Sequence, residues 1–157
     1  MAGPTEWVLL AYRMPREPST PRITVWRKLK RLGAAQVVDG LVALPLDART
    51  KEQLEWVGDE IRTAGGEATI WTARLGSVRQ ERDLATRMAD LVATEYRAVI
   101  GAAQHAEDEE PSIRRRTLAR LRRELRRIGH RDYFPPAERE AARRAVDALA
   151  EVVEATP

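Results

Sequence analysis

The sequence predicts an α+β fold in which a ferredoxin-like βαββαβ sheet over residues 1–76 is followed by a helical extension over residues 77–157. Short apolar runs rich in strand-forming residues alternate with segments of helical periodicity in the first half, and an Asp-Gly pair separates two of these runs. In the second half, apolar residues recur only at helical spacing. Such a sheet packs both helices on one face and leaves the other face open to a partner or a ligand.

The first strand and the first helix are predicted from an apolar run and from helix-end signals. Residues 6–12 form a short run rich in strand formers. Ser19 and Thr20 can cap a helix whose first turn accommodates Pro21, and Gly33 suits its C-terminal end. Its apolar face is expected to comprise Val25, Trp26, Leu29 and Leu32.

A hairpin, a second helix and a fourth strand complete the predicted sheet domain. Residues 34–38 and 41–45 are predicted to pair around Asp39-Gly40, a dipeptide favoured in tight turns. A helix is predicted over residues 50–64, and a strand follows over residues 67–74. The large rings of Trp7, Trp26, Trp56 and Trp71 are expected in the core.

Three helices are predicted in the extension. The first runs from about Ser77 to Gln104, and its apolar side is expected to cover the sheet or to form a dimer seam; it comprises Leu84, Met88, Leu91, Val92, Tyr96, Val99 and Ile100. An Arg-rich helix packs along Leu118, Leu121, Leu125 and Ile128. A last, Ala-rich helix packs along Ala141, Ala145, Leu149 and Val152.

Charge changes sign from segment to segment, although the net charge of the chain is only +3. Residues 1–34 carry +5, residues 35–110 carry −7, residues 111–131 carry +8, and the remainder carries −3. Separate blocks of one sign create separate electrostatic faces. The two basic blocks favour binding to a polyanion.

Several function classes lack support in the sequence. The chain has no cysteine, which excludes disulfides, thiolate nucleophiles and thiol-based redox sensing and suits a reducing cytoplasm. No targeting segment and no membrane-spanning run is evident. His105 and His130 are far apart and are expected to be exposed, so we expect no metal site, no cofactor and no enzymatic activity.

Two groups of segments carry a family resemblance. The early group comprises residues 7–10, 15–18, 21–22, 25–34 and 39–40. The late group comprises Leu121-Arg122-Arg123-Glu124-Leu125 and Asp132-Tyr133-Phe134-Pro135. Together they resemble the N-terminal domain of the chromate-resistance regulator (ChrB) family over most of the 157 residues.

The resemblance implies a cytoplasmic regulator of a chromate-efflux operon that binds promoter DNA and responds to chromate. Longer members carry a second, C-terminal domain after this one, and we expect this sequence to represent the N-terminal domain alone. A stand-alone binding module and an incomplete sensor are therefore alternatives. Chromate would be bound by Arg side chains and backbone N–H groups, for example at Thr20-Pro21-Arg22.

The expected DNA contacts are basic residues on the first helix and in the loop before it, where they can neutralise phosphates. They are Arg13, Arg16, Arg22, Arg27, Lys28, Lys30 and Arg31. Secondary phosphate contacts are expected on the Arg-rich helix at Arg115, Arg116, Arg120, Arg123 and Arg127. Alternatively, these arginines pair with residues 107–110, within the protein or across a homodimer.

Two rival functions come from other classes. The strand, basic helix and hairpin are also similar to the small CRISPR-associated metal-dependent nuclease family, which needs an acidic residue at the end of the first strand to hold a divalent cation. Arg13 follows Tyr12 there, which disfavours nuclease activity. The other rival is a non-enzymatic dimeric adaptor, whose basic surfaces would be neutralised by its own acidic helices.

Overall fold

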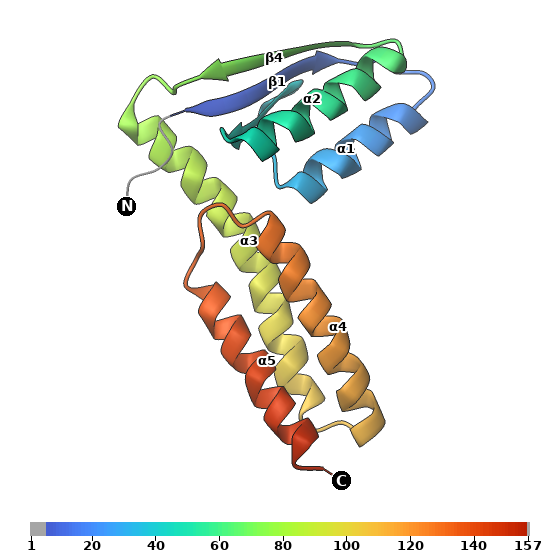
Figure 1. Ribbon diagram of the computed structural model, residues 1–157, viewed down its shortest axis with the longest axis vertical. Coiled ribbons are helices and arrows are strands. Elements are labelled where there is room, and N and C mark those ends of the chain that lie inside the picture. Colours follow the sequence, from blue (N-terminus) through green and yellow to red (C-terminus); the bar gives the residue numbers. More distant parts are fainter. Residues whose placement is uncertain (1–5, 157) are drawn as a thin grey trace. The chain divides into compact units, whose positions relative to one another are not determined.

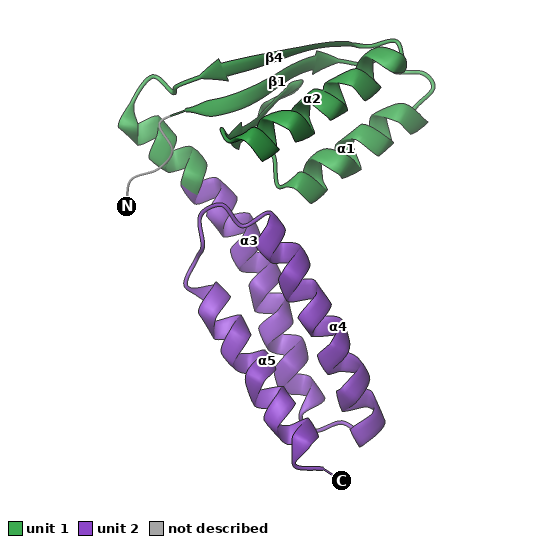
Figure 2. Cartoon of the chain, in the orientation of Figure 1, with its two compact units in different colours: residues 1–85 green, residues 86–157 purple. Residues whose placement is uncertain are grey.

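The computed structural model describes residues 6–156 and shows four strands and five helices in that range (Figure 1). The chain divides into two compact units, residues 1–85 and residues 86–157, and the boundary falls within helix α3, Val78–Ala106 (Figure 2). We describe each unit separately.

Unit 1 has the element order β-α-β-β-α-β that the sequence predicts, followed by the start of α3. Its elements are β1 Trp7–Arg13, α1 Thr20–Leu32, β2 Ala35–Val38, β3 Leu41–Pro45, α2 Ala48–Thr63 and β4 Glu67–Ala73. The four strands form one antiparallel sheet in the order β2-β3-β1-β4. The α+β class is therefore confirmed.

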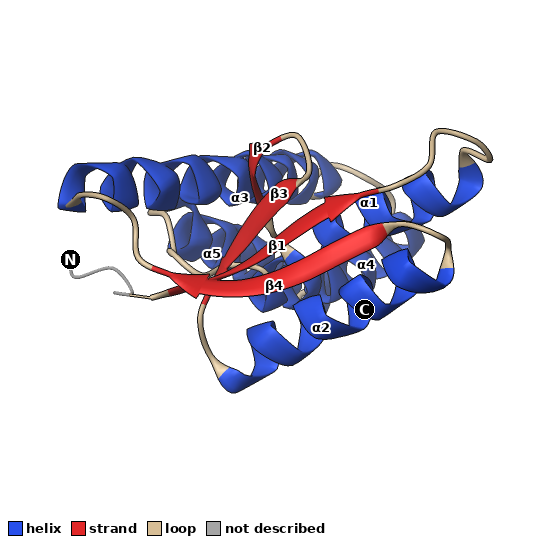
Figure 3. Cartoon of the chain, turned by 90° about the horizontal axis from the view of Figure 1, so that it is seen from above, coloured by secondary structure: helices blue, strands red, loops and turns tan. Residues whose placement is uncertain are grey.

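Strand β1 is central in the sheet of unit 1. It pairs with β3 on one side and with β4 over its full length on the other, from Trp7 opposite Ala73 to Arg13 opposite Glu67. Helices α1 and α2 lie on the same side of the sheet (Figure 3). A Cβ placed on Gly58 of α2 would lie 3.6 Å from the Leu10 side chain of β1, so Leu10 belongs to the helix-covered face.

Turn and cap residues determine where the elements of unit 1 end. Gly33 terminates α1 with φ = 77°, a left-handed conformation that favours glycine. Gly40 adopts the same φ in the β2–β3 turn, and a Cβ there would lie 2.6 Å from the backbone oxygen of Tyr12. The Tyr12 N–H donates to the Gly40 carbonyl at 2.8 Å. The hairpin turn therefore lies directly against the end of β1.

The core of unit 1 excludes three of the four tryptophans, which corrects the expectation that all four rings are buried. Trp7 is buried on β1, but Trp26, Trp56 and Trp71 are 51%, 62% and 58% exposed. On α1 the buried residues are Val25 and Leu29, and Trp26 lies one position after Val25. One residue advances a helix by about 100°, which turns Trp26 away from the buried face.

Unit 2 is a three-helix arrangement of the C-terminal part of α3 with α4, Pro111–His130, and α5, Glu138–Glu154. Its core combines residues of all three helices: Val92, Tyr96, Val99, Ala103, Ala106, Leu118, Leu121, Ile128, Ala142, Val146 and Leu149. Val92, Tyr96, Val99 and Ile100 of the expected apolar side of α3 therefore pack against α4 and α5 of the same chain. Leu91, which was assigned to the same apolar side, is 69% exposed.

Helix α5 packs along a line one position away from the expected one. Ala142, Val146 and Leu149 are buried, whereas Ala141 and Ala145 are half-buried. Ala-rich helices present similar small side chains on several faces, so apolar spacing alone does not distinguish neighbouring lines. No helix within residues 6–156 has the length and apolarity to cross a membrane.

Candidate nucleic-acid interface

Helix α1 carries most of the basic residues that the sequence analysis singled out, and four of them lie around its solvent-exposed side. It contains five basic residues and no acidic one. Arg22, Arg27, Lys30 and Arg31 are exposed. None of these four cations has a carboxylate within ion-pair distance among the described residues. The surface they form is called the α1 basic surface below.

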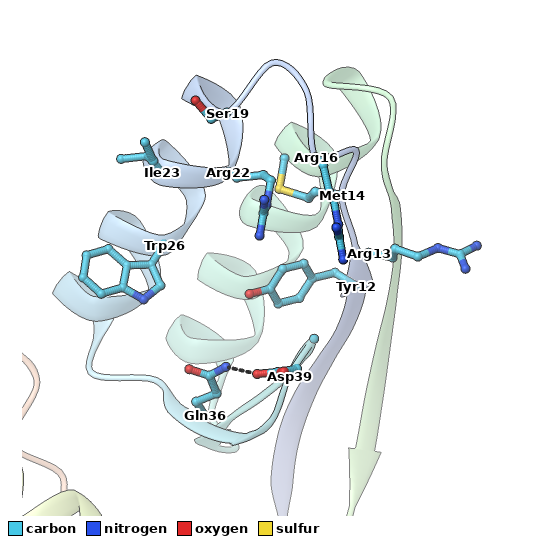
Figure 4. Close-up of a pocket in the computed structure, with 11 residues that line it drawn as sticks. Tyr12, Arg13, Met14, Arg16, Ser19, Arg22, Ile23, Trp26, Gln36 and Asp39 are labelled. Carbon is cyan, nitrogen blue, oxygen red and sulfur yellow. Dashed lines mark hydrogen bonds between the residues drawn. The ribbon is translucent and has the colours of Figure 1, made fainter.

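Two of the expected contacts are held by carboxylates instead. Lys28 is partly buried and forms an ion pair with Glu60 of α2. Arg13 donates to both carboxylate oxygens of Glu67, its cross-strand neighbour on β4, at 3.0 Å. The Arg13 side chain points away from α1 (Figure 4). Arg13 and Lys28 are therefore less available for phosphates than the rest of the predicted set.

A pocket of about 770 Å³ lies beside the α1 basic surface. It is formed by the end of β1, the loop after it, α1 and the β2–β3 turn (Figure 4). Its lining is Tyr12, Arg13, Met14, Arg16, Ser19, Arg22, Ile23, Trp26, Gln36, Asp39 and Gly40. We call it the α1 pocket. Three of the expected DNA contacts, Arg13, Arg16 and Arg22, line it together with Trp26.

Aromatic and polar groups in the α1 pocket complement its guanidinium groups. Trp26 lines it from α1, and the Lys30 ammonium lies 4.4 Å from the centroid of the indole. Burial raises the pKa of the Tyr12 hydroxyl; nearby Arg22 lowers that pKa and nearby Asp39 raises it. The Tyr12 hydroxyl therefore stays protonated at neutral pH and can donate a hydrogen bond.

Gln36 and Asp39 are pocket residues that sequence reasoning did not identify as a site. The Gln36 amide donates to the Asp39 carboxylate at 3.3 Å across the turn (Figure 4). The sequence assigned Asp39 only a turn role. The contact of this turn with Tyr12 is tertiary, and no periodic signal in the sequence indicates it.

Helix α4 is the second basic element, within unit 2. Of its eight arginines, Arg127 pairs with Glu124 at 3.0 Å, and Arg114 donates to the backbone oxygen of Glu107 at 3.3 Å. The other six, including the expected contacts Arg115, Arg116, Arg120 and Arg123, have no ion-pair partner in the described part of the chain. The alternative in which residues 107–110 neutralise these arginines is not observed there.

A smaller pocket of about 350 Å³ in unit 2 also gathers arginines. It is lined by Tyr96, Arg122, Leu125, Arg126, Gly129, Arg139 and Arg143. Arg143 pairs with Glu140 at 2.8 Å, and Arg139 lies 3.8 Å from the buried Asp132. Carboxylates therefore partly neutralise this pocket.

The two histidines lie outside the lining of the arginine-lined pockets. His105 and His130 are exposed as expected, and His105 lies 3.3 Å from Glu109 one turn along the chain. Within residues 6–156 no three His, Asp or Glu side chains are grouped as metal ligands require.

Comparison with known proteins identifies the family. The model described as "Protein ChrB, N-terminal" matches residues 22–156, a range that includes Arg22 to Arg31 of α1 and all of α4. The chain is 26% identical over 135 residues to Protein ChrB of Cupriavidus metallidurans, a match that covers 83% of this chain and 41% of that protein. It thus spans about two fifths of the length of that relative. Because the family model covers most of its residues, the chain belongs to the ChrB N-terminal family.

Proposed function

We propose that the chain is a DNA-binding transcriptional regulator of a chromate-resistance operon and that the α1 basic surface contacts promoter DNA. The observation that carries the proposal is the pair of exposed cations Arg27 and Arg31, which lie one turn apart on α1 and have no carboxylate partner among the described residues. Unpaired guanidinium groups on one surface are suited to neutralise successive phosphates and to release counterions.

Helix α2 provides a contrast within the same unit. Lys51 pairs with Glu55 at 2.9 Å, and Arg62 pairs with Asp59 at 2.8 Å. These are the i,i+4 and i,i+3 pairs typical of an ordinary solvated helix face. Helix α1 has no acidic residue to form such pairs, so the charges of its cations other than Lys28 remain available to an external polyanion.

Helix α4 supports the proposal as a second phosphate-binding surface. Its buried residues are Leu118, Leu121 and Ile128, and its unpaired arginines are exposed on the remaining surface or line the small pocket. An arginine-rich face contributes affinity and salt dependence, whereas sequence preference requires contacts with base edges.

Family membership supports the association of the chain with chromate resistance. The effector, the oligomeric state and the location are further parts of the same proposal. We propose chromate as the effector, a homodimer as the acting species and the cytoplasm as the location. The strand order β2-β3-β1-β4 supports a ferredoxin-like classification of unit 1. We propose no enzymatic activity, since the guanidinium of Arg13 at the end of β1 disfavours a divalent cation there.

The proposal is tested by a pair of double variants with the same loss of charge. Arg27→Ala/Arg31→Ala removes two unpaired cations of α1, whereas Lys51→Ala/Arg74→Ala removes two exposed cations that pair with Glu55 and Glu6. We expect the first variant to weaken binding to duplex DNA from the chain's own upstream region. It should also reduce the slope of log affinity against log salt by about 2, at about 0.9 per phosphate contact. Fluorescence anisotropy over a salt series measures both quantities.

The control variant should keep the wild-type affinity and slope within a factor of about two, since its cations are already paired. Equal losses of DNA affinity in the two variants would show that the cations of α1 act only through the net charge of the chain. An unchanged affinity in a folded Arg27→Ala/Arg31→Ala variant would exclude α1 from the DNA interface.

A further inference from the structure

The α1 pocket has the size and lining of a small-molecule site, in addition to its place beside the α1 basic surface. Its volume of about 770 Å³ lies within the range of about 300–1,000 Å³ that is common for ligand sites. The pocket therefore has room for a small organic ligand.

An exposed indole at the pocket provides a stacking surface. Trp26 is about half exposed, although large aromatic rings are usually buried unless they have another use. Stacking on an exposed aromatic ring contributes to affinity for any nucleobase, because every base has a π face. Arg16 and Arg22 line the same pocket and have no carboxylate partner among the described residues. They can bind a phosphate on the ligand that Trp26 stacks.

The carboxylate of Asp39 is the one acidic side chain among the described residues that line the α1 pocket. It accepts a hydrogen bond from the Gln36 amide, and it lies in the β2–β3 turn that lines the pocket. A carboxylate is an acceptor and binds best to two adjacent donors. Guanine presents N1–H and the exocyclic N2–H2 side by side on its Watson–Crick edge, whereas adenine and cytosine each present an amino group beside an acceptor.

We propose that the α1 pocket binds a guanine nucleotide, with the base stacked on Trp26, its Watson–Crick edge at Asp39 and its phosphate at Arg16 and Arg22. The nucleotide can be a free molecule or an unpaired guanine of DNA, since both present the same base and phosphate. This inference deepens the proposed function, because an unpaired guanine beside bound DNA would add base recognition to phosphate contacts made by α1.

Titration calorimetry with the full chain tests the proposal, with guanosine, inosine and adenosine 5′-monophosphates as probes. Inosine keeps N1–H but lacks the exocyclic amino group. We expect guanosine monophosphate to bind at least about fivefold more tightly than the other two, equivalent to about 1 kcal/mol for the extra hydrogen bond. Oligothymidine with one central guanine, compared with oligothymidine alone, tests the DNA source.

Two variants and one control locate the site. Trp26→Leu should weaken guanosine monophosphate binding on the order of tenfold, and Asp39→Asn should abolish the preference over adenosine monophosphate. Trp56→Leu is the matched control, because Trp56 is equally exposed in the same unit but does not line the α1 pocket. Circular dichroism checks that the variants fold.

The outcomes separate this inference from the DNA-binding proposal. Equal affinity for the three nucleotides, affinity too weak to measure, or equal effects of Trp26→Leu and Trp56→Leu would overturn the guanine site, even where the chain binds duplex DNA. Guanosine monophosphate binding without any duplex binding would instead overturn the DNA-binding proposal and retain the pocket as a nucleotide site.

Discussion

Tyr96 and Asp132 connect the helices of unit 2 through one buried polar contact. The Tyr96 hydroxyl on α3 donates to Asp132, in the segment between α4 and α5, at 2.7 Å. The Asp132 side chain is fully buried, and its second oxygen has no partner among the described residues. Burial raises the pKa of Tyr96 far above its ordinary value, and the hydrogen bond to Asp132 raises it further.

This shift predicts a pH dependence of stability. In the unfolded chain a tyrosine loses its proton near pH 10, whereas Tyr96 in the folded chain keeps it. The protonated Tyr96 hydroxyl therefore contributes fully to the free energy of unfolding below about pH 10. This contribution is lost as the pH rises further. We expect Tyr96→Phe to be less stable by about 1–3 kcal/mol at pH 7, because Asp132 loses its donor.

Above about pH 10 the difference between Tyr96→Phe and the wild type should shrink, because the variant has no Tyr96 proton to lose. Urea unfolding at several values between pH 7 and pH 11 measures this difference. A constant difference over the whole range would show that Tyr96 is not held in its protonated form.

At the same scale, the exposed tryptophans show where sequence reasoning failed. Buried Val25 and Leu29 define the inner face of α1, and Trp26 lies between basic residues one turn away on either side, Arg22 and Lys30. That i−4 and i+4 pattern of charge indicates an exposed position. The prediction that Trp26 is buried relied on the apolar character of its ring and not on this pattern of charge. Trp71, in turn, lies on the edge strand β4, where burial is not assured.

The elements themselves were largely predictable. The strands, the hairpin and the helix ends agree with the sequence-based boundaries to within a few residues, because local signals such as Asp39-Gly40 and Gly33 determine them. Ser19 precedes α1 as expected but makes no side-chain cap. The α1 pocket was not predictable, since it requires the β2–β3 turn, the end of β1 and α1 to meet in three dimensions.

Packing of α3 against α4 and α5 gives a prediction at the element scale. Leu121 of α4 is 1% exposed within the core of unit 2, so Leu121→Ala should destabilise the fold by about 2–5 kcal/mol. Leu91→Ala on α3 is the control. Leu91 is exposed, and Ala favours helices as well as Leu does. The free energy of unfolding of Leu91→Ala should therefore stay within about 0.5 kcal/mol of the wild-type value.

Urea denaturation at two protein concentrations measures both variants. A large, concentration-dependent loss in Leu91→Ala would contradict the description of Leu91 as a solvent-exposed position and would place it in an interface between two copies of the chain. A loss below about 1 kcal/mol in Leu121→Ala would contradict the assignment of Leu121 to the core.

At the scale of the whole molecule, positive charge is concentrated in one helix of each unit. Helix α1 in unit 1 and helix α4 in unit 2 contain 13 of the 27 basic residues and one acidic residue. Most of these cations have no carboxylate partner in the described part of the chain, whereas Lys51 and Arg62 on α2 each have one. The net charge of +3 conceals this distribution, which was evident from the segments of the sequence.

The most direct test of the central claim is DNA binding by the wild-type chain over a salt series, with DNA from its own upstream region and with an unrelated duplex. Each is measured alone, with chromate and with sulfate. We predict tighter binding to the upstream DNA, a steep salt dependence, and weakening by chromate but not by sulfate. Equal and weak binding to both duplexes, or no binding, would contradict the assignment of this chain as a DNA-binding regulator.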